Sequence, residues 1–142
     1  MIDRKEIAEE ILNNVGKKRC KHLTEFLDDW TKGLYVILRV IDKSETEVVA
    51  GDLSKALNVS TARMAVALST LDAKKWIKKH KSNSDARKTV VQLTDLGRIK
   101  LKEREEQLVQ IISEFLEKLD DSEVNQLFNI IKKTVLMEED HA

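Results

Sequence analysis

The sequence predicts a mostly α-helical chain with one two-stranded β-hairpin, and three observations lead to this fold class. The 142 residues include no proline and only four glycines, which favours long helices over a many-turned β fold. Apolar residues recur at helical spacing towards both ends of the chain. Two β-prone segments, 76–81 and 88–93, flank a run of turn-forming residues. With 42% hydrophobic residues, the chain has enough apolar side chains to bury a core.

The N-terminal third predicts helices. Residues 3–15 have one apolar face, formed by Ile7, Ile11, Leu12 and Val15. Gly16 and the basic residues after it predict a break, beyond which the helix resumes through Leu23, Phe26 and Leu27. From Trp30 to about Asp42 the sequence is apolar nearly all round, which predicts a buried helix. Residues 44–46 then predict a turn, and 48–49 a very short strand.

Two closely spaced helices are expected next. The first spans Asp52–Leu57, with Leu53, Ala56 and Leu57 facing inward and Asn58 ending it. Ser60 is a suitable N-cap for the second, whose buried stripe consists of Met64, Leu68 and Leu71. A connection of about three residues between two helices is typical of a helix-turn-helix.

A hairpin and two further helices complete the chain. The strands Trp76–Lys81 and Lys88–Leu93 enclose a turn at 82–87, and a helix-turn-helix followed by a hairpin is the layout of a winged helix. Thr94 is expected to cap a long helix, and residues 120–122 separate it from the last one. The long helix has apolar residues at near-heptad spacing: Leu101, Leu108, Ile111, Ile112, Phe115, Leu116 and Leu119. The last helix carries Val124, Leu127, Phe128, Ile131 and Val135.

The apolar faces of the terminal helices exceed what a small winged helix can cover, which predicts a homodimer. We therefore expect three parts. Residues 1–46 form N-terminal helices for dimerisation and scaffold, 47–94 form the winged helix-turn-helix, and 95–142 form C-terminal dimerisation helices.

Charge is balanced over the whole chain but not along it. The formal net charge is zero, yet residues 51–94 contain nine Lys and Arg against three Asp. A basic block within acidic flanks indicates one positive face, suited to an anionic polymer. An ordinary solvated charged surface is the alternative that charge alone leaves open.

Several classes of protein are excluded or disfavoured. The single cysteine, Cys20, cannot form an intrachain disulfide or a multi-thiolate metal site. The chain has no apolar run long enough for a membrane helix and no signal peptide, so we expect a soluble cytoplasmic protein. No glycine-rich phosphate loop or catalytic motif is present. We expect neither an enzyme nor a bound cofactor.

Three segments carry a resemblance to a known family. They are Asp52–Ser60, the wing residues Asp85-Ala86-Arg87, and Leu93-Thr94-Asp95-Leu96-Gly97-Arg98. Together with Leu71 they resemble the MarR family of bacterial and archaeal transcriptional regulators. The resemblance implies a winged-helix homodimer that binds a pseudo-palindromic operator, as a repressor, and releases it on meeting an effector. It also implies a recognition helix at about 60–74 and a wing at 76–93.

Two positions depart from that pattern. The family usually has glycine where Lys75 stands, and a left-handed lysine would cost about 1 kcal/mol more, so we expect the helix to end differently here. Basic residues are common in the family at the positions of Val66 and Thr70. Their absence leaves Arg63 as the one strong donor to base edges on this helix.

The candidate DNA-binding residues follow from this layout. Small outward side chains permit close approach to the groove, Arg63 can pair with guanine, and Arg87 suits a narrow minor groove with Asp85 orienting it. Lysines on the hairpin, Lys78 included, can neutralise phosphates, and Ser54 and Lys55 are expected at the DNA backbone. The predicted set is Ser54, Lys55, Ser60, Thr61, Ala62, Arg63, Val66, Ser69, Lys79, Lys81, Asp85, Arg87 and Lys88.

Regulatory sites are weaker predictions. An effector pocket would be lined by Phe26, Trp30, Tyr35 and Arg39, although aromatic residues at these positions equally suit a core. Cys20 has basic neighbours that would favour a thiolate, but a spectator cysteine is the preferred interpretation. The histidines are scattered, so no metal site is expected. The rival function is a winged-helix protein-interaction module without DNA binding.

Overall fold

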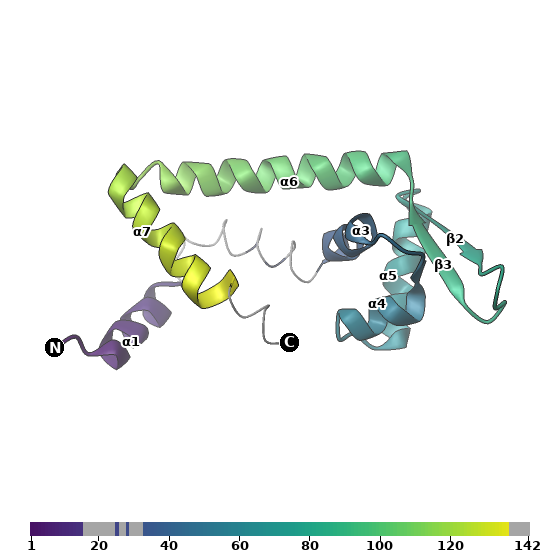
Figure 1. Cartoon of the computed structure of the whole chain (residues 1–142), viewed down its shortest axis with the longest axis horizontal. Coiled ribbons are helices and arrows are strands. Elements are labelled where there is room, and N and C mark those ends of the chain that lie inside the picture. Colours follow the sequence, from purple (N-terminus) through teal and green to yellow (C-terminus); the bar gives the residue numbers. More distant parts are fainter. Residues whose placement is uncertain (16–24, 26–27, 29–32, 137–142) are drawn as a thin grey trace. The chain divides into compact units, whose positions relative to one another are not determined.

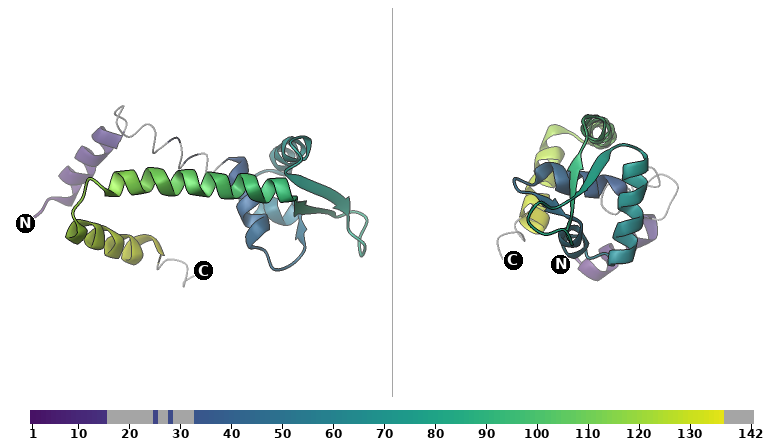
Figure 2. Two further views of the ribbon diagram at one scale, coloured as in Figure 1. Left: turned by 90° about the horizontal axis from the view of Figure 1, so that it is seen from above. Right: turned by 90° about the vertical axis from the view of Figure 1, so that its right-hand side faces the viewer.

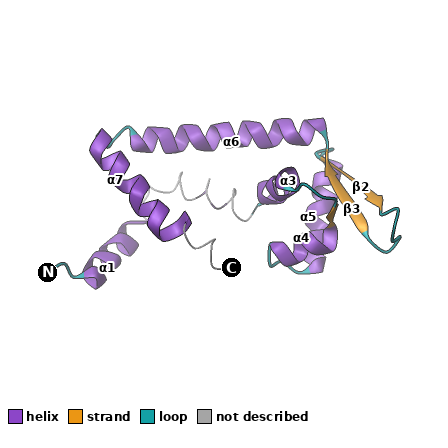
Figure 3. Cartoon of the chain, viewed as in Figure 1, coloured by secondary structure: helices purple, strands orange, loops and turns teal. Residues whose placement is uncertain are grey.

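The structure, a computed structural model, describes residues 1–15, 25, 28 and 33–136. Helices dominate it, and the mostly helical fold class is confirmed (Figures 1 and 3). In chain order the elements are α1 (Arg4–Val15), α3 (Leu34–Lys43), β1 (Val48–Val49), α4 (Ala50–Ala56), α5 (Thr61–Ala73), β2 (Ile77–Lys81), β3 (Thr89–Leu93), α6 (Asp95–Leu116), α7 (Asp121–Ile131) and the π-helical turn η1 (Lys132–Leu136).

The chain divides into two compact units, Met1–Glu106 and Gln107–Ala142. The first contains the helix-turn-helix and the sheet, and the second contains α7 and the C-terminal part of α6. The predicted assignment of roles to 1–46, 47–94 and 95–142 concerns function, and it stays a prediction.

The sheet is antiparallel and has the strand order β1-β3-β2. Ile77 faces Leu93 at the base of the β2–β3 hairpin, and Lys81 faces Thr89 near its tip. The hairpin extends beyond the helices of its unit (Figure 2) and is the predicted wing. The short strand expected at 48–49 is present, and it pairs with β3.

The core of the first unit is formed where α3, α4 and α5 meet the base of the sheet. Its most deeply buried side chains include Leu38, Leu53, Met64, Leu71, Ile77 and Val91. The buried stripe predicted for the second helix of the pair is confirmed, because Met64, Leu68 and Leu71 are all buried. Ala56, expected to face inward, is exposed instead. In α4 the buried positions are Leu53 and Ser54.

Helix boundaries differ from the expected ones at three places. α4 begins at Ala50, directly after β1, rather than at Asp52. α7 begins at Asp121, because Asp120 accepts a hydrogen bond from the Glu123 amide while the Glu123 carboxylate accepts one from the Asp120 amide. This reciprocal capping box starts the helix inside the predicted separator. For the helix predicted from Trp30, α3 is described from Leu34 onward, and residues 30–32 lie outside the described residues.

The second unit leaves much of its apolar surface exposed. α7 has no buried residue, and its Phe128, Ile130 and Ile131 side chains are exposed. On α6, Leu108 is buried, whereas Val109, Ile112 and Phe115 are exposed. No helix in the described part of the chain is both long enough and apolar enough to cross a membrane.

Candidate nucleic-acid interface

Helix α5 is positioned by its cap and by its buried stripe. The Ser60 hydroxyl accepts a hydrogen bond from the Arg63 amide at 3.2 Å, which confirms the predicted N-cap. With one side of the helix anchored in the core, the opposite side is presented outward (Figure 1). The expected outward residues Thr61, Ala62, Arg63, Ala65, Val66 and Ser69 are all exposed.

The exposed face of α5 is formed by small side chains. Val66 is its largest apolar residue and has a relative exposure of 68%. A shallow hollow runs along this face, lined by Ala65, Val66, Ser69, Thr70, Ala73 and Lys74. A helix with such short side chains can approach base edges closely in a major groove.

Helix α5 ends with a left-handed residue, which corrects the expectation for Lys75. Lys75 has φ of 60° and lies directly after the C-cap Lys74. Its amide donates to the Asp72 carbonyl at 2.9 Å, and the Trp76 amide donates to the Leu71 carbonyl at 3.0 Å. These two bonds form a Schellman motif. The lysine therefore takes the conformation in which the family usually has glycine, because the motif satisfies the last carbonyls of the helix.

The preceding helix ends in the same way. Asn58, with φ of 50°, donates to the Lys55 carbonyl, and Val59 donates to the Ser54 carbonyl at 3.0 Å. Asn58 is thus the stop that the sequence predicted. Asparagine tolerates this region better than other non-glycine residues.

The prediction for Ser54 is wrong for its side chain. Ser54 is buried, and its hydroxyl donates to the Ala50 carbonyl one turn earlier at 3.4 Å. It faces the core because it follows Leu53 on the inward side of α4. Lys55 is exposed, as contact with a DNA backbone requires.

The wing tip presents Arg87 and Lys88 to solvent. Both are exposed, and Asp85 is half-buried. The Asp85 carboxylate accepts a hydrogen bond from the Arg87 amide at 3.0 Å, and the Asp85 carbonyl accepts one from the Lys88 amide at 3.0 Å. Asp85 was expected to orient Arg87. The printed bond runs to the backbone of Arg87, so Asp85 shapes the turn that presents the side chain.

The lysines of β2 are divided between the two faces of the hairpin. Lys79 and Lys81 lie on the face that also carries the core residues Ile77, Val91 and Leu93, whereas Lys78 lies on the opposite face. Lys79 is paired with Asp72 of α5, with 3.9 Å between the ammonium nitrogen and a carboxylate oxygen. Sequence reasoning treated the four wing lysines alike, because a long-range ion pair leaves no local signal.

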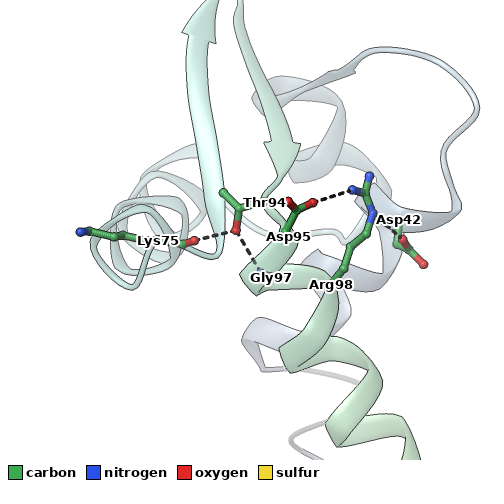
Figure 4. Close-up of polar contacts among 6 residues, drawn as sticks. All are labelled: Asp42, Lys75, Thr94, Asp95, Gly97 and Arg98. Carbon is green, nitrogen blue, oxygen red and sulfur yellow. Dashed lines mark hydrogen bonds and ion pairs between the residues drawn. The ribbon is translucent and has the colours of Figure 1, made fainter.

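The base of the wing is joined to the end of α5 through Thr94 (Figure 4). Its hydroxyl donates to the Lys75 carbonyl at 2.6 Å and accepts from the Gly97 amide at 3.0 Å. The second bond confirms Thr94 as the cap of α6. Arg98 lies one residue further on and forms ion pairs with Asp42 at 3.8 Å and Asp95 at 3.9 Å. The motif Leu-Thr-x-x-Gly was visible in the sequence, but its partners were not.

The predicted effector pocket is only partly within the described residues. Phe26 and Trp30 lie outside them. Tyr35 packs against Trp76, with 5.8 Å between the ring centroids, and Arg39 is exposed. A different hollow, of about 490 Å³, lies between the start of α3, the turn after α4, and α5. It is lined by Gly33, Leu34, Val36, Ile37, Leu57, Val59, Arg63, Met64 and Ala67.

The redox and metal questions are limited by what the structure describes. Cys20 and two of the histidines, His22 and His141, lie outside the described residues. His80 is exposed on β2. Within residues 1–15, 25, 28 and 33–136, no three metal-ligating side chains come together.

Residues 35–112 match the family model described as "Winged helix DNA-binding domain". Among solved structures, the YusO protein from Bacillus subtilis aligns with a TM-score of 0.76 at 19% identity, covering 93% of this chain and 96% of that one. Wild-type MarR from E. coli aligns with a TM-score of 0.68 at 22% identity, covering 95% and 98%. FabT from Streptococcus pneumoniae, solved in complex with DNA, has a TM-score of 0.65 at 19% identity and covers 99% and 100%. No curated protein matches the sequence.

Proposed function

The chain belongs to the winged helix DNA-binding domain family, and we propose that it is a sequence-specific transcriptional regulator. It binds a pseudo-palindromic operator as a homodimer in the cytoplasm and represses by occupying that operator. The fold it shares with MarR and with FabT, whose structure was solved bound to DNA, supports this proposal.

One observation carries the proposal. The exposed face of α5 is small and nearly uncharged, whereas the neighbouring hairpin is rich in lysine and arginine. Such a face fits closely against base edges in a groove, and the hairpin cations suit phosphates or a narrow minor groove. We assign base contacts to Arg63, Val66 and neighbouring small residues of α5, and phosphate contacts to Lys81 and Lys88.

Exposed apolar surface supports the homodimer. In the second unit Val109, Phe128 and Ile130 each have more than half of their surface accessible, at 63%, 52% and 57%. In α1, Ile11 and Leu12 are exposed at 58% and 74%. Amphipathic helices with so little of their apolar face covered are typical of subunit interfaces. We propose residues 3–28 and 100–137 as the dimer surface.

Release by an effector is the remaining part of the proposal. The hollow between α3 and α5 is mostly apolar, its volume of about 490 Å³ suits a small molecule, and Arg63 is among its lining residues. A molecule bound there would contact the helix that we assign to DNA. We therefore place the effector in this hollow rather than around Tyr35 and Arg39.

The test is a titration of two variants across a salt series. The DNAs are a duplex selected by the wild-type chain from a random-sequence pool and a scrambled duplex of equal length. Lys88→Ala should weaken both DNAs alike and flatten the slope of log affinity against log salt by about 0.9 per lost phosphate contact. Arg63→Ala should instead reduce the preference for the selected duplex and leave the slope nearly unchanged. Opposite behaviour of the two variants would contradict the assigned roles.

The rival proposal is a protein-interaction module. It is favoured by the exposed face of α5, where Val66 and Thr70 stand at positions that are often basic in the family. This function predicts no binding to either duplex even at low salt, where phosphate contacts are strongest. A steep salt dependence excludes it.

A further inference from the structure

Thr94 satisfies the two carbonyl groups that the end of α5 leaves open. The Schellman motif uses the amides of Lys75 and Trp76, and the carbonyls of these two residues are then free to accept from elsewhere. Thr94 donates to both, from its hydroxyl to Lys75 at 2.6 Å and from its amide to Trp76 at 3.0 Å. The chain from 75 to 94, which includes the whole wing, is therefore closed at its base by one residue (Figure 4).

The closure brings three elements into one place. The recognition helix α5 ends just before Lys75, β2 leaves at Ile77, and β3 arrives at Leu93. Gly97 completes the contact from α6, since a Cβ at this position would overlap the Trp76 carbonyl group. The space for Thr94 to reach Lys75 thus depends on a glycine one turn into α6.

We propose that Thr94 is a positioning residue for DNA recognition, whose hydroxyl fixes the angle between the wing and the recognition helix. The inference rests on the proposed function. It goes beyond that function by assigning wing geometry to a residue that does not itself contact DNA.

The geometry makes a clamp at the base effective. Five-residue strands span about 17 Å at about 3.4 Å per residue, so a rotation of about 10° at the base displaces the wing tip by about 3 Å. Recognition sites tolerate about 0.5 Å and 10–20° of misplacement. Arg87, beyond the strand ends, would lose its contact while α5 stayed in place.

A simple capping role would make a different prediction. Aspartate caps helices as well as serine and threonine do, because only an acceptor is needed for the Gly97 amide. A carboxylate has no proton to donate to the Lys75 carbonyl, whereas serine has one. Thr94→Asp therefore retains the cap and opens the clamp, and Thr94→Ser retains both.

The experiment is a double-mutant cycle between Thr94→Val and Arg87→Ala, with affinity measured for the selected duplex. In the wild-type background Arg87→Ala should lower affinity by about 5- to 150-fold. In the Thr94→Val background, where the wing is already misplaced, the further loss should be less than about twofold. Arg63→Ala, on the recognition helix, should cost the same in both backgrounds. An equal Arg87 effect in both backgrounds would overturn the proposal.

Two single variants keep the test decisive if Thr94→Val does not fold. Thr94→Ser should bind like the wild type, and Thr94→Asp should bind at least about tenfold more weakly while its helix content is unchanged. Thr46→Asp controls for the added charge, because Thr46 is an exposed threonine remote in sequence from the wing. If Thr94→Asp binds no worse than Thr46→Asp, capping alone explains Thr94 and the proposal is wrong.

A measurement without DNA separates failure of the clamp from failure of the proposed function. Hydrogen exchange in 76–81 and 89–94 should be faster in Thr94→Asp than in Thr94→Ser, with the amides of α4 and α5 unchanged. Equal exchange in the two variants contradicts the clamp even if the chain binds DNA. Faster exchange in a chain that binds neither duplex supports the clamp and rejects the regulator.

Discussion

Lys75 occupies a backbone conformation that costs lysine more than glycine. Its φ of 60° lies in the left-handed region, where a Cβ is penalised. We predict that Lys75→Gly raises the free energy of unfolding by about 1 kcal/mol. Lys74→Gly is the matched control, since Lys74 is right-handed with φ of −74° and should gain nothing. Urea denaturation of both variants checks the prediction, and equal effects would contradict it.

Gly97 is required by a close approach between backbones rather than by its own conformation. A Cβ there would overlap the Trp76 carbonyl, whereas a Cβ at Gly51 would meet nothing within 4 Å. Gly97→Ala should therefore destabilise the fold by about 1–3 kcal/mol. Gly51→Ala, within α4, should stabilise it by up to about 1 kcal/mol. Thermal unfolding of the pair measures both; similar melting temperatures would show that the junction yields to the methyl group.

At the level of elements, the wing lysines are not equivalent. Lys79 and Lys81 share a face of β2, but only Lys79 is recorded in an ion pair, with Asp72. We predict that Lys81→Ala flattens the salt slope of DNA binding by about 0.9, while Lys79→Ala changes it less. Titrations of the two variants on one duplex across a salt series test this. A larger effect at Lys79 would show that its pairing with Asp72 is given up on DNA.

The elements themselves were largely predictable, because each depends on local features. Ser60 and Thr94 are caps that can be identified from residue type, and the stripe Met64, Leu68 and Leu71 has helical spacing. Trp76 was expected at the start of β2, but the strand begins at Ile77. The tertiary reason is that the Trp76 amide closes the end of α5 and its carbonyl binds Thr94.

At the level of the whole molecule, we expect a stable homodimer. Phe128 on α7 is exposed at 52%, and a charge at this position would be unpaired in an apolar interface. Phe128→Asp should raise the dimer dissociation constant by about tenfold or more. Thr46→Asp, outside the proposed surface, should leave it unchanged. Sedimentation equilibrium gives both constants, and a wild-type chain that is monomeric at micromolar concentration would end the dimer proposal.

The sequence by itself determined the order and type of the elements, the wing and the buried stripe of α5. Propensity, capping and periodicity act over a few residues, so they can be read along the chain. Tertiary structure decided what depends on contacts between distant segments. Those contacts turn the Ser54 hydroxyl into the core, pair Lys79 with Asp72, and join Thr94 to Lys75 across 19 residues. A residue's type shows what it can bind, but only the fold places a partner within reach.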